Sequence, residues 1–218
     1  MKSKLFLILF ITLSTCSPQK QPVPEVVQAV LAGNYEKLKA LIDHGENINV
    51  RNEKGTTLLI LAIESQKYEI ANMLIEHDTK IDTPDVLGTT ALMYALSAKG
   101  NTIYLIKHLL DKGANPNART KKGFTPLFYA LHNDSLLALN LLLEKGADPT
   151  IKADDDLTVL HESAANGNAK AVRMLLPYFK DLSIKDSKGY TPLMYAKEND
   201  KREVASLLDS VLSNVNNK

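Results

Sequence analysis

The sequence predicts an all-α solenoid of about six helix–turn–helix units behind a short N-terminal leader. A six-residue phrase recurs five times, as GTTLLI at 55–60, GTTALM at 88–93, GFTPLF at 123–128, DLTVLH at 156–161 and GYTPLM at 189–194. The central threonine of the phrase stands at positions 57, 90, 125, 158 and 191, so the spacings are 33, 35, 33 and 33 residues. Apolar residues recur at helical spacing after each phrase. A fixed period of this length is the mark of a repeat architecture, in which each unit buries its apolar face against its neighbours.

The N-terminus reads as an export signal. Residues 1–16 are MKSKLFLILFITLSTC, with two lysines ahead of an apolar run from Leu5 to Leu13. This run is too short to span a bilayer, which takes roughly 20 residues, but it fits a secretory signal. Its end resembles the lipobox of bacterial lipoproteins, although Thr15 stands where that family has Gly, Ala or Ser. The resemblance implies a signal peptide over 1–15 and lipidation of Cys16; a plain signal peptide with an incidental cysteine is the alternative.

A tether and six units follow the leader. Residues 16–23 are polar and rich in proline, which predicts an extended tether. The units are expected at 24–51, 52–84, 85–119, 120–152, 153–185 and 186–212, with a polar tail at 213–218. The first unit lacks the recurring phrase, as an abbreviated N-terminal cap would. In the last unit Asp209 replaces a branched aliphatic residue of the second helix, which predicts a polar C-terminal cap.

Unit 120–152 shows how each repeat is expected to fold. Lys121–Gly123 form a tight turn at a loop tip. Thr125 is placed to cap a helix through its hydroxyl, and Pro126 suits the first helical position. Residues 133–134 end that helix, and Gly146 ends the second one.

Two units depart from this pattern. The third carries two extra residues at 98–102, in the turn between its helices, where an insertion is tolerated. In the fifth, Pro177 should shorten or kink the second helix.

The phrase and its period are similar to those of the ankyrin repeat, whose core is T-P-L-H-x-A. The resemblance covers residues 24–212 and implies stacked helix pairs joined by loops. It also implies that His161, at the histidine of the phrase, makes loop hydrogen bonds that stabilise the stack. Partners of ankyrin proteins usually dock on the loop tips and the adjoining inner helices. The resemblance therefore implies a protein–protein interaction module rather than an enzyme.

Carrying those docking positions over to this sequence gives a set of candidate binding residues. They are Val86, Leu87, Lys121, Lys122, Phe124, Asp154, Asp155 and Tyr190. An apolar pair at a loop tip is costly to leave in water, so Val86 and Leu87 are the leading candidates. The other interpretation is that this pair folds back onto the second or fourth repeat. Phe124 and Tyr190 are of the type enriched at binding hot spots.

The composition and motifs of the chain exclude several kinds of functional site. The only cysteine is Cys16, which excludes a disulfide framework and a cysteine metal site. Formal net charge is +1, so no basic field favours nucleic acid. The acidic run at 154–156 lacks the spacing of a calcium loop and is expected to face Arg119, Lys121 and Lys122 of the preceding tip. Neither a phosphate-cradling glycine loop nor a nucleophile elbow is present, so no cofactor, metal or catalytic activity is predicted.

Recurring polar residues have structural explanations. His44 and His77 are one period apart, near the ends of second helices, and their separation of about 10 Å is too large for a shared metal. A cation near a helix C-terminus is the preferred interpretation. Tyr94, Tyr129 and Tyr195 share one repeat position and are expected to pack between helices, with each hydroxyl reaching solvent or a loop.

Together these features predict an exported protein, lipid-anchored at the bacterial envelope, that binds a protein partner as a monomer. Ser17 after the lipid-bearing cysteine favours the outer membrane, facing the periplasm. A soluble periplasmic protein is the alternative location. A periplasmic immunity protein that blocks a toxic enzyme is the second functional hypothesis, and an enzyme with an unrecognised site is the third.

Overall fold

The computed structural model describes residues 23–77, 79–100 and 102–216 of the chain. The predicted signal peptide at 1–15, Cys16 and the rest of the tether to residue 22 lie outside the described residues. Within the described part the chain is helical, and its one strand-like pairing is the antiparallel bridge between Arg51 and Thr57. The predicted all-α class is confirmed.

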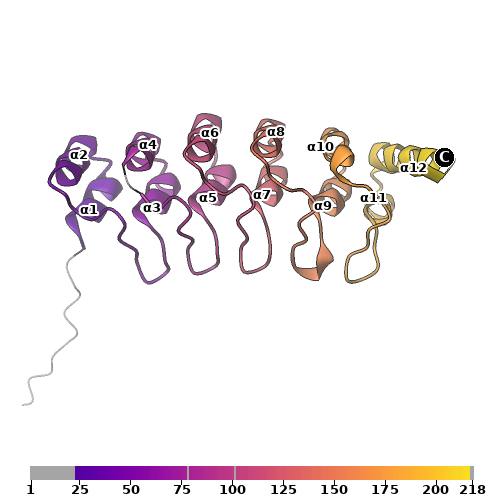
Figure 1. The fold of residues 1–218 in the computed structure, drawn as a ribbon, viewed down its shortest axis with the longest axis horizontal. Helices are drawn as coiled ribbons and strands as arrows, with labels where there is room; N and C mark the ends of the chain where they lie inside the picture. The colour runs from indigo at the N-terminus through magenta and orange to yellow at the C-terminus, as the bar shows by residue number, and fades with distance from the viewer. Residues whose placement is uncertain (1–22, 78, 101, 217–218) are drawn as a thin grey trace, which may run out of the picture.

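The helices form two rows (Figure 1). Odd-numbered helices make an inner row, from which loops project to one side, and even-numbered helices make an outer row behind it. The α-helices are α1 (Glu25–Ala32), α2 (Tyr35–Asp43), α3 (Leu58–Glu64), α4 (Tyr68–Glu76), α5 (Ala91–Ser97), α6 (Ile103–Asp111), α7 (Pro126–His132), α8 (Leu136–Glu144), α9 (Val159–Asn166), α10 (Ala169–Leu175), α11 (Pro192–Glu198) and α12 (Arg202–Asn216).

The core consists largely of equivalent positions of the repeats. The outer helices after the first contribute a fully buried leucine at one shared position, namely Leu74, Leu109, Leu142, Leu175 and Leu208, and α2 contributes Leu38 one turn earlier. Inner helices contribute a second row, among them Leu59, Leu92, Leu127 and Leu160. Burying one such side chain stabilises the fold by about 1.5–3 kcal/mol. The buried residues therefore run through the whole stack as one continuous core.

Helix starts follow the sequence pattern only in part. The Thr57 hydroxyl accepts the Ile60 N–H (3.2 Å), as an N-cap should. Thr125 also occupies the N-cap position, but its side chain makes no capping hydrogen bond, so that prediction is wrong. The Phe128 N–H, which the hydroxyl would take, donates to the Thr125 backbone carbonyl instead (3.0 Å).

Helix ends follow the turn chemistry. Helix α7 ends at His132, and Asp134 then adopts a φ of 50°. After α8, Gly146 adopts a φ of 83°, the left-handed conformation predicted for it. Helix α10 stops at Leu175 and continues as a 3₁₀ turn, Leu176–Tyr178, because Pro177 cannot supply a helical N–H.

The last helix is longer than the sequence predicted. Helix α12 runs to Asn216, so residues 213–216 of the expected polar tail are helical. A left-handed glycine follows each of α2, α6 and α8, at Gly45, Gly113 and Gly146, whereas no glycine follows Gly189 in the sequence. Asp209 is exposed and pairs with Lys197 (3.1 Å), which keeps this end of the stack polar, as predicted for a cap.

We call the loops that project from the inner row fingers: residues 51–57, 84–90, 119–125, 152–158 and 185–191. In the first of them the turn is closed by the Gly55 N–H donating to the Asn52 carbonyl (2.9 Å). The Asn52 side chain also accepts the Lys54 and Thr56 N–H groups (both 2.9 Å). The finger at 152–158 differs, because it has no glycine and holds Asp155 and Asp156 at φ values of 60° and 59°.

A ladder of backbone hydrogen bonds joins each finger to the next. One N–H near each tip donates to a carbonyl of the preceding finger. The four bonds are Val86 N to Lys54 O (3.0 Å), Lys121 N to Leu87 O (2.8 Å), Asp154 N to Lys122 O (2.9 Å) and Ser187 N to Asp155 O (2.8 Å). The ladder fixes the spacing of the fingers, so they form one continuous surface.

Candidate protein-binding surface

The leading candidate residues are exposed at a finger tip. Val86 is 47% exposed and Leu87 is 63% exposed, although both backbones take part in the ladder. Their side chains therefore do not fold back onto the second or fourth repeat. Two adjacent aliphatic side chains in water are costly, which is typical of a contact surface.

Asp85 holds this apolar tip in one conformation. Its carboxylate accepts the Leu87 and Thr89 N–H groups (both 2.8 Å) and the Tyr94 hydroxyl (3.0 Å). Burial and the bond to Asp85 raise the pKa of Tyr94, which keeps the hydroxyl a donor. A tip fixed before binding loses little conformational entropy when a partner docks. The prediction that this tyrosine reaches a loop is confirmed.

Phe124 lies on the next finger and opens onto an aromatic pocket. The Phe124 and Phe128 rings meet edge to face, with centroids 5.1 Å apart. Together with Tyr129, His132 and Glu162 they line a cavity of about 230 Å³. The sequence singled out Phe124 but missed Phe128 and Glu162. The repeat period could have identified Glu162, because this residue occupies in the fifth repeat the position that Tyr129 occupies in the fourth.

Tyr190 lies on the last finger, beyond the finger of the fifth repeat. Its ring packs 5.6 Å from that of Tyr195. A hydrogen bond with Glu198 raises the pKa of Tyr190. Asp186 accepts the Tyr195 hydroxyl (2.7 Å), and this bond raises the pKa of Tyr195 to about 12. The structure thus places the other candidates on three successive fingers and Tyr190 at the far end.

The acidic tip lies beside the basic tip of the preceding finger, as predicted, since the Asp154 N–H donates to the Lys122 carbonyl, but no ion pair between the described side chains joins the two tips. Lys121, Lys122, Asp154 and Asp155 are all exposed, and none of them is in an ion pair with another among the described residues. Asp156 pairs instead with Lys152 of its own finger (3.1 Å). Arg119 does not pair with them either, because its guanidinium donates to the Lys152 carbonyl (2.9 Å).

His161 has the structural role that the resemblance implied. It is buried, its Nδ1 accepts the Thr158 N–H (3.2 Å), and its Nε2 faces the Tyr190 carbonyl (3.2 Å). Nε2 is therefore the donor, and the ring is neutral. His44 and His77 stand at the C-terminal ends of α2 and α4. Among the described residues, no group of His, Cys, Asp and Glu side chains could hold a metal ion.

His161 predicts a pH dependence of stability. Burial lowers the pKa of its folded-state ring below the ordinary value of 6.5. As pH falls through about 6.5, the unfolded chain binds a proton that the folded chain does not, so the free energy of unfolding decreases. We expect His161→Gln to remove this part of the dependence, because Gln keeps a donor and an acceptor but does not titrate. Urea denaturation of both proteins at neutral and mildly acidic pH measures this free energy. If it depends on pH equally in wild type and His161→Gln, His161 is not the group responsible.

Comparison with known proteins agrees with this geometry. The family described as ankyrin repeats (3 copies) matches residues 26–120, 85–153 and 152–218. No curated protein matches the chain as a relative. Among the described residues, none of the helices has the length and apolar character needed to cross a bilayer. The matched segments cover nearly all of the chain, so it belongs to the ankyrin-repeat family, whose repeats form protein–protein interaction modules.

Proposed function

We propose that this chain is an exported, lipid-anchored protein of the bacterial envelope that binds a partner protein through its fingers. The observation that carries the binding surface is the apolar tip of Val86 and Leu87, exposed and held rigid by Asp85. Burying aliphatic side chains that start in water, at little cost in entropy, is the contribution expected of a hot spot.

The neighbouring fingers supply the rest of the contact area. The pocket that Phe124 lines with residues of α7 and α9 opens beside the finger next to the apolar tip, and it would accept a side chain of the partner. Lys121, Lys122, Asp154 and Asp155 are exposed and suit a polar rim. An interface of standard size buries about 800 Å² on each partner, so it would extend over several fingers. The protein would act as a monomer, with both ends of the stack capped.

The anchor rests on the leader sequence. Cys16 follows a basic and apolar stretch with the layout of a lipoprotein signal. Acylation there, followed by residues 17–22 as a spacer, would hold the stack close to a membrane. The outer membrane, facing the periplasm, is the favoured location, and a soluble periplasmic protein is what remains if Cys16 is not acylated.

A periplasmic immunity protein that blocks a toxic enzyme is the second candidate function. The observation in its favour is that the exposed lysines of one finger and the aspartates of the next form no ion pairs with one another among the described residues. Such groups are available for a charged active-site cleft and would accelerate association. Ankyrin repeats are typically non-catalytic binding scaffolds, so an enzyme is the weakest of the three hypotheses.

Photo-crosslinking tests the binding surface and can identify the partner. A photoreactive amino acid replaces Leu87 in one strain and Leu137 in another. Both leucines are well exposed, 63% and 73%, but Leu137 lies on the outer helix α8, away from the fingers. We expect a crosslinked partner from position 87 and none from position 137. Crosslinks from position 137 alone would place the interface on the outer helices and contradict the proposal.

A further inference from the structure

The hydrogen-bond ladder of the fingers leaves one N–H group of the described residues without a protein acceptor. Each N–H at the ladder position donates to the preceding finger, as at Val86 and Lys121. In the first finger this position is Glu53, and its N–H has no partner among the described residues. Among the described residues no finger precedes it, because they begin at Val23 and enter α1 through Pro24.

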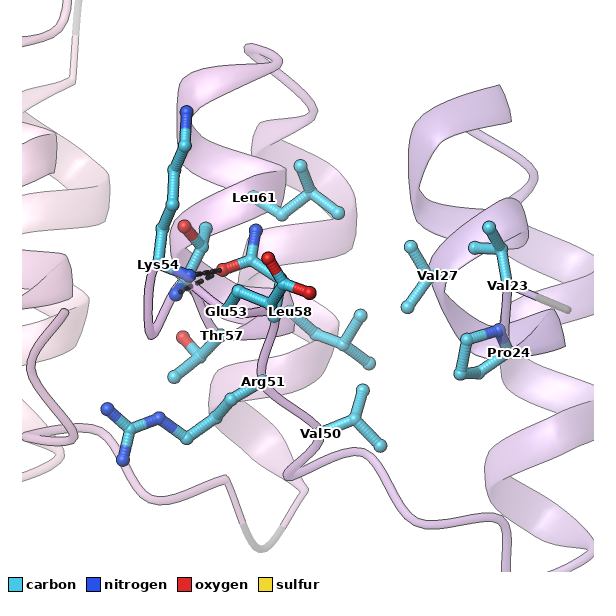
Figure 2. A pocket seen from close by; sticks show the side chains of 12 residues that line it. Val23, Pro24, Val27, Val50, Arg51, Glu53, Lys54, Thr57, Leu58 and Leu61 are labelled. Atoms are coloured by element: carbon cyan, nitrogen blue, oxygen red, sulfur yellow. Dashed lines mark hydrogen bonds between the residues drawn. The ribbon is translucent and has the colours of Figure 1, made fainter. Parts of the chain in front are cut away.

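A groove lies where the preceding finger would stand. It has a volume of about 680 Å³ and runs between α1 and the first finger. Figure 2 shows Pro24 and Val27 on one wall, facing Val50, Leu58 and Leu61 on the other. Glu53 is part of the same lining. The groove therefore combines apolar walls with an unused backbone donor, while every other pair of neighbouring repeats fills this space with a finger.

The tether preceding α1 does not have the residues to complete the ladder. Buried Ala29 and left-handed Gly33 match Ala62 and Gln66, so Pro24 is equivalent to Thr57. Two residues before that threonine, every finger has a positive φ. The values are 74° at Gly55, 84° at Gly88, 76° at Gly123, 59° at Asp156 and 84° at Gly189.

The tether has Pro22 at this position. A proline ring fixes φ at about −65°, which is not compatible with the left-handed conformation. The φ of this residue sets the direction of the carbonyl before it, and that carbonyl is the ladder acceptor in the other fingers. A finger with the backbone of the other five therefore requires a conformation that the sequence does not allow at this position.

A second copy of the chain does not fit either. A finger of another copy would bring its own helix pair into the layer that α1 and α2 already occupy (Figure 1). A groove of about 680 Å³ has room for a single extended segment and not for a whole repeat.

From this we infer that the groove binds an extended peptide segment of another protein. The segment continues the inter-repeat interface: one of its backbone carbonyls accepts the Glu53 N–H, and an aliphatic side chain packs among Val27, Val50 and Leu61. Addition of an extended strand to an open backbone edge is an established mode of peptide recognition. This site goes beyond the proposed binding surface and is separate from the apolar tip at Val86 and Leu87.

A pair of substitutions at one position isolates the backbone donor. Asn52 and Gly55 occupy the first and fourth positions of a turn, so Glu53 is at the second, where proline is favoured. Glu53→Pro thus deletes the N–H and keeps the turn, while Glu53→Ala deletes only the side chain. The probe is a library of random short peptides, selected on the full chain, from which one enriched peptide is synthesised.

The expected result has three parts. The peptide slows hydrogen exchange at the Glu53 amide of the wild-type chain. Its affinity falls about tenfold in Glu53→Pro and is unchanged in Glu53→Ala, as loss of one net hydrogen bond implies. A third variant, Leu61→Glu, loses binding to a similar or larger degree. This variant should fold, because Glu162 occupies the same position in the fifth repeat.

Four results would overturn the inference. The first is slow hydrogen exchange of the Glu53 amide in the chain alone, which would show that its own tether fills the groove. The second is head-to-tail association of the chain in sedimentation. The third is that the selected peptides bind Leu61→Glu as well as wild type but bind Val86→Ser/Leu87→Ser less tightly, which would place them on the finger tips. The fourth is a selection on the full chain that enriches no peptide at all.

Discussion

Replacing Gly88 by Ala is expected to destabilise the stack far more than replacing Gly113 by Ala. Both glycines have a left-handed backbone, with φ values of 84° and 90°. A Cβ on Gly113 would meet nothing within 4 Å, whereas a Cβ on Gly88 would lie 2.9 Å from both the Lys121 N and the Thr120 Cα. Gly113→Ala should therefore cost about 1–2 kcal/mol of strain, and Gly88→Ala about 2–5 kcal/mol, because the next finger must also move.

The comparison of the two variants isolates the contact between fingers. Chemical denaturation gives the free energy of unfolding of each, and hydrogen exchange at the Lys121 amide reports the ladder bond to Leu87. We expect faster exchange at Lys121 in Gly88→Ala alone. Equal destabilisation of the two variants, with Lys121 protected in both, would show that the fingers are not packed as closely as the structure has them.

Cys16→Ala is expected to move the protein out of the membrane fraction or to block removal of its leader. Acyl chains contribute about 0.8 kcal/mol per buried CH₂, so loss of the acylated cysteine removes the proposed source of membrane affinity. Metabolic labelling with a fatty acid analogue, followed by fractionation, measures both effects. Thr15→Ala is the matched control, because it brings the sequence closer to the lipoprotein pattern and should label at least as well as wild type.

The two possible outcomes separate the anchor from the binding surface. Label that does not depend on Cys16 would refute the lipoprotein assignment and leave a soluble periplasmic protein. Capture of the partner through Leu87 would be unaffected by that result, since the finger surface does not include the leader.

The fold could be predicted because its determinants are local and are repeated. The period placed each helix pair, and residues such as Pro126 and Gly146 determine where helices begin and end. The cap of Thr125 was predicted wrongly because two acceptors on one residue compete for the same N–H. The end of α12 was missed because no glycine marks it in the sequence.

The candidate site was predicted less well because it depends on contacts between repeats. Exposure of Val86 and Leu87 was left open by the sequence and depends on how neighbouring fingers pack. The sequence placed the acidic run beside the basic residues of the preceding tip, but it did not show that Asp156 pairs with Lys152 of its own finger. The aromatic pocket and the groove beside Glu53 each join two repeats, so neither is visible in a single unit.

Binding of the partner by the finger tips is tested most directly by the dissociation constant of the crosslinked partner, measured for wild type and for Val86→Ser/Leu87→Ser. A thermal melt of both proteins is recorded beside it. We predict a loss of about 2 kcal/mol or more, which is roughly 30-fold in affinity, with an unchanged melt, because both side chains are exposed. Leu137→Ser, the matched exposed leucine of the outer row, should change neither quantity. Unchanged affinity in the folded double variant, or an equal loss in Leu137→Ser, would contradict the account.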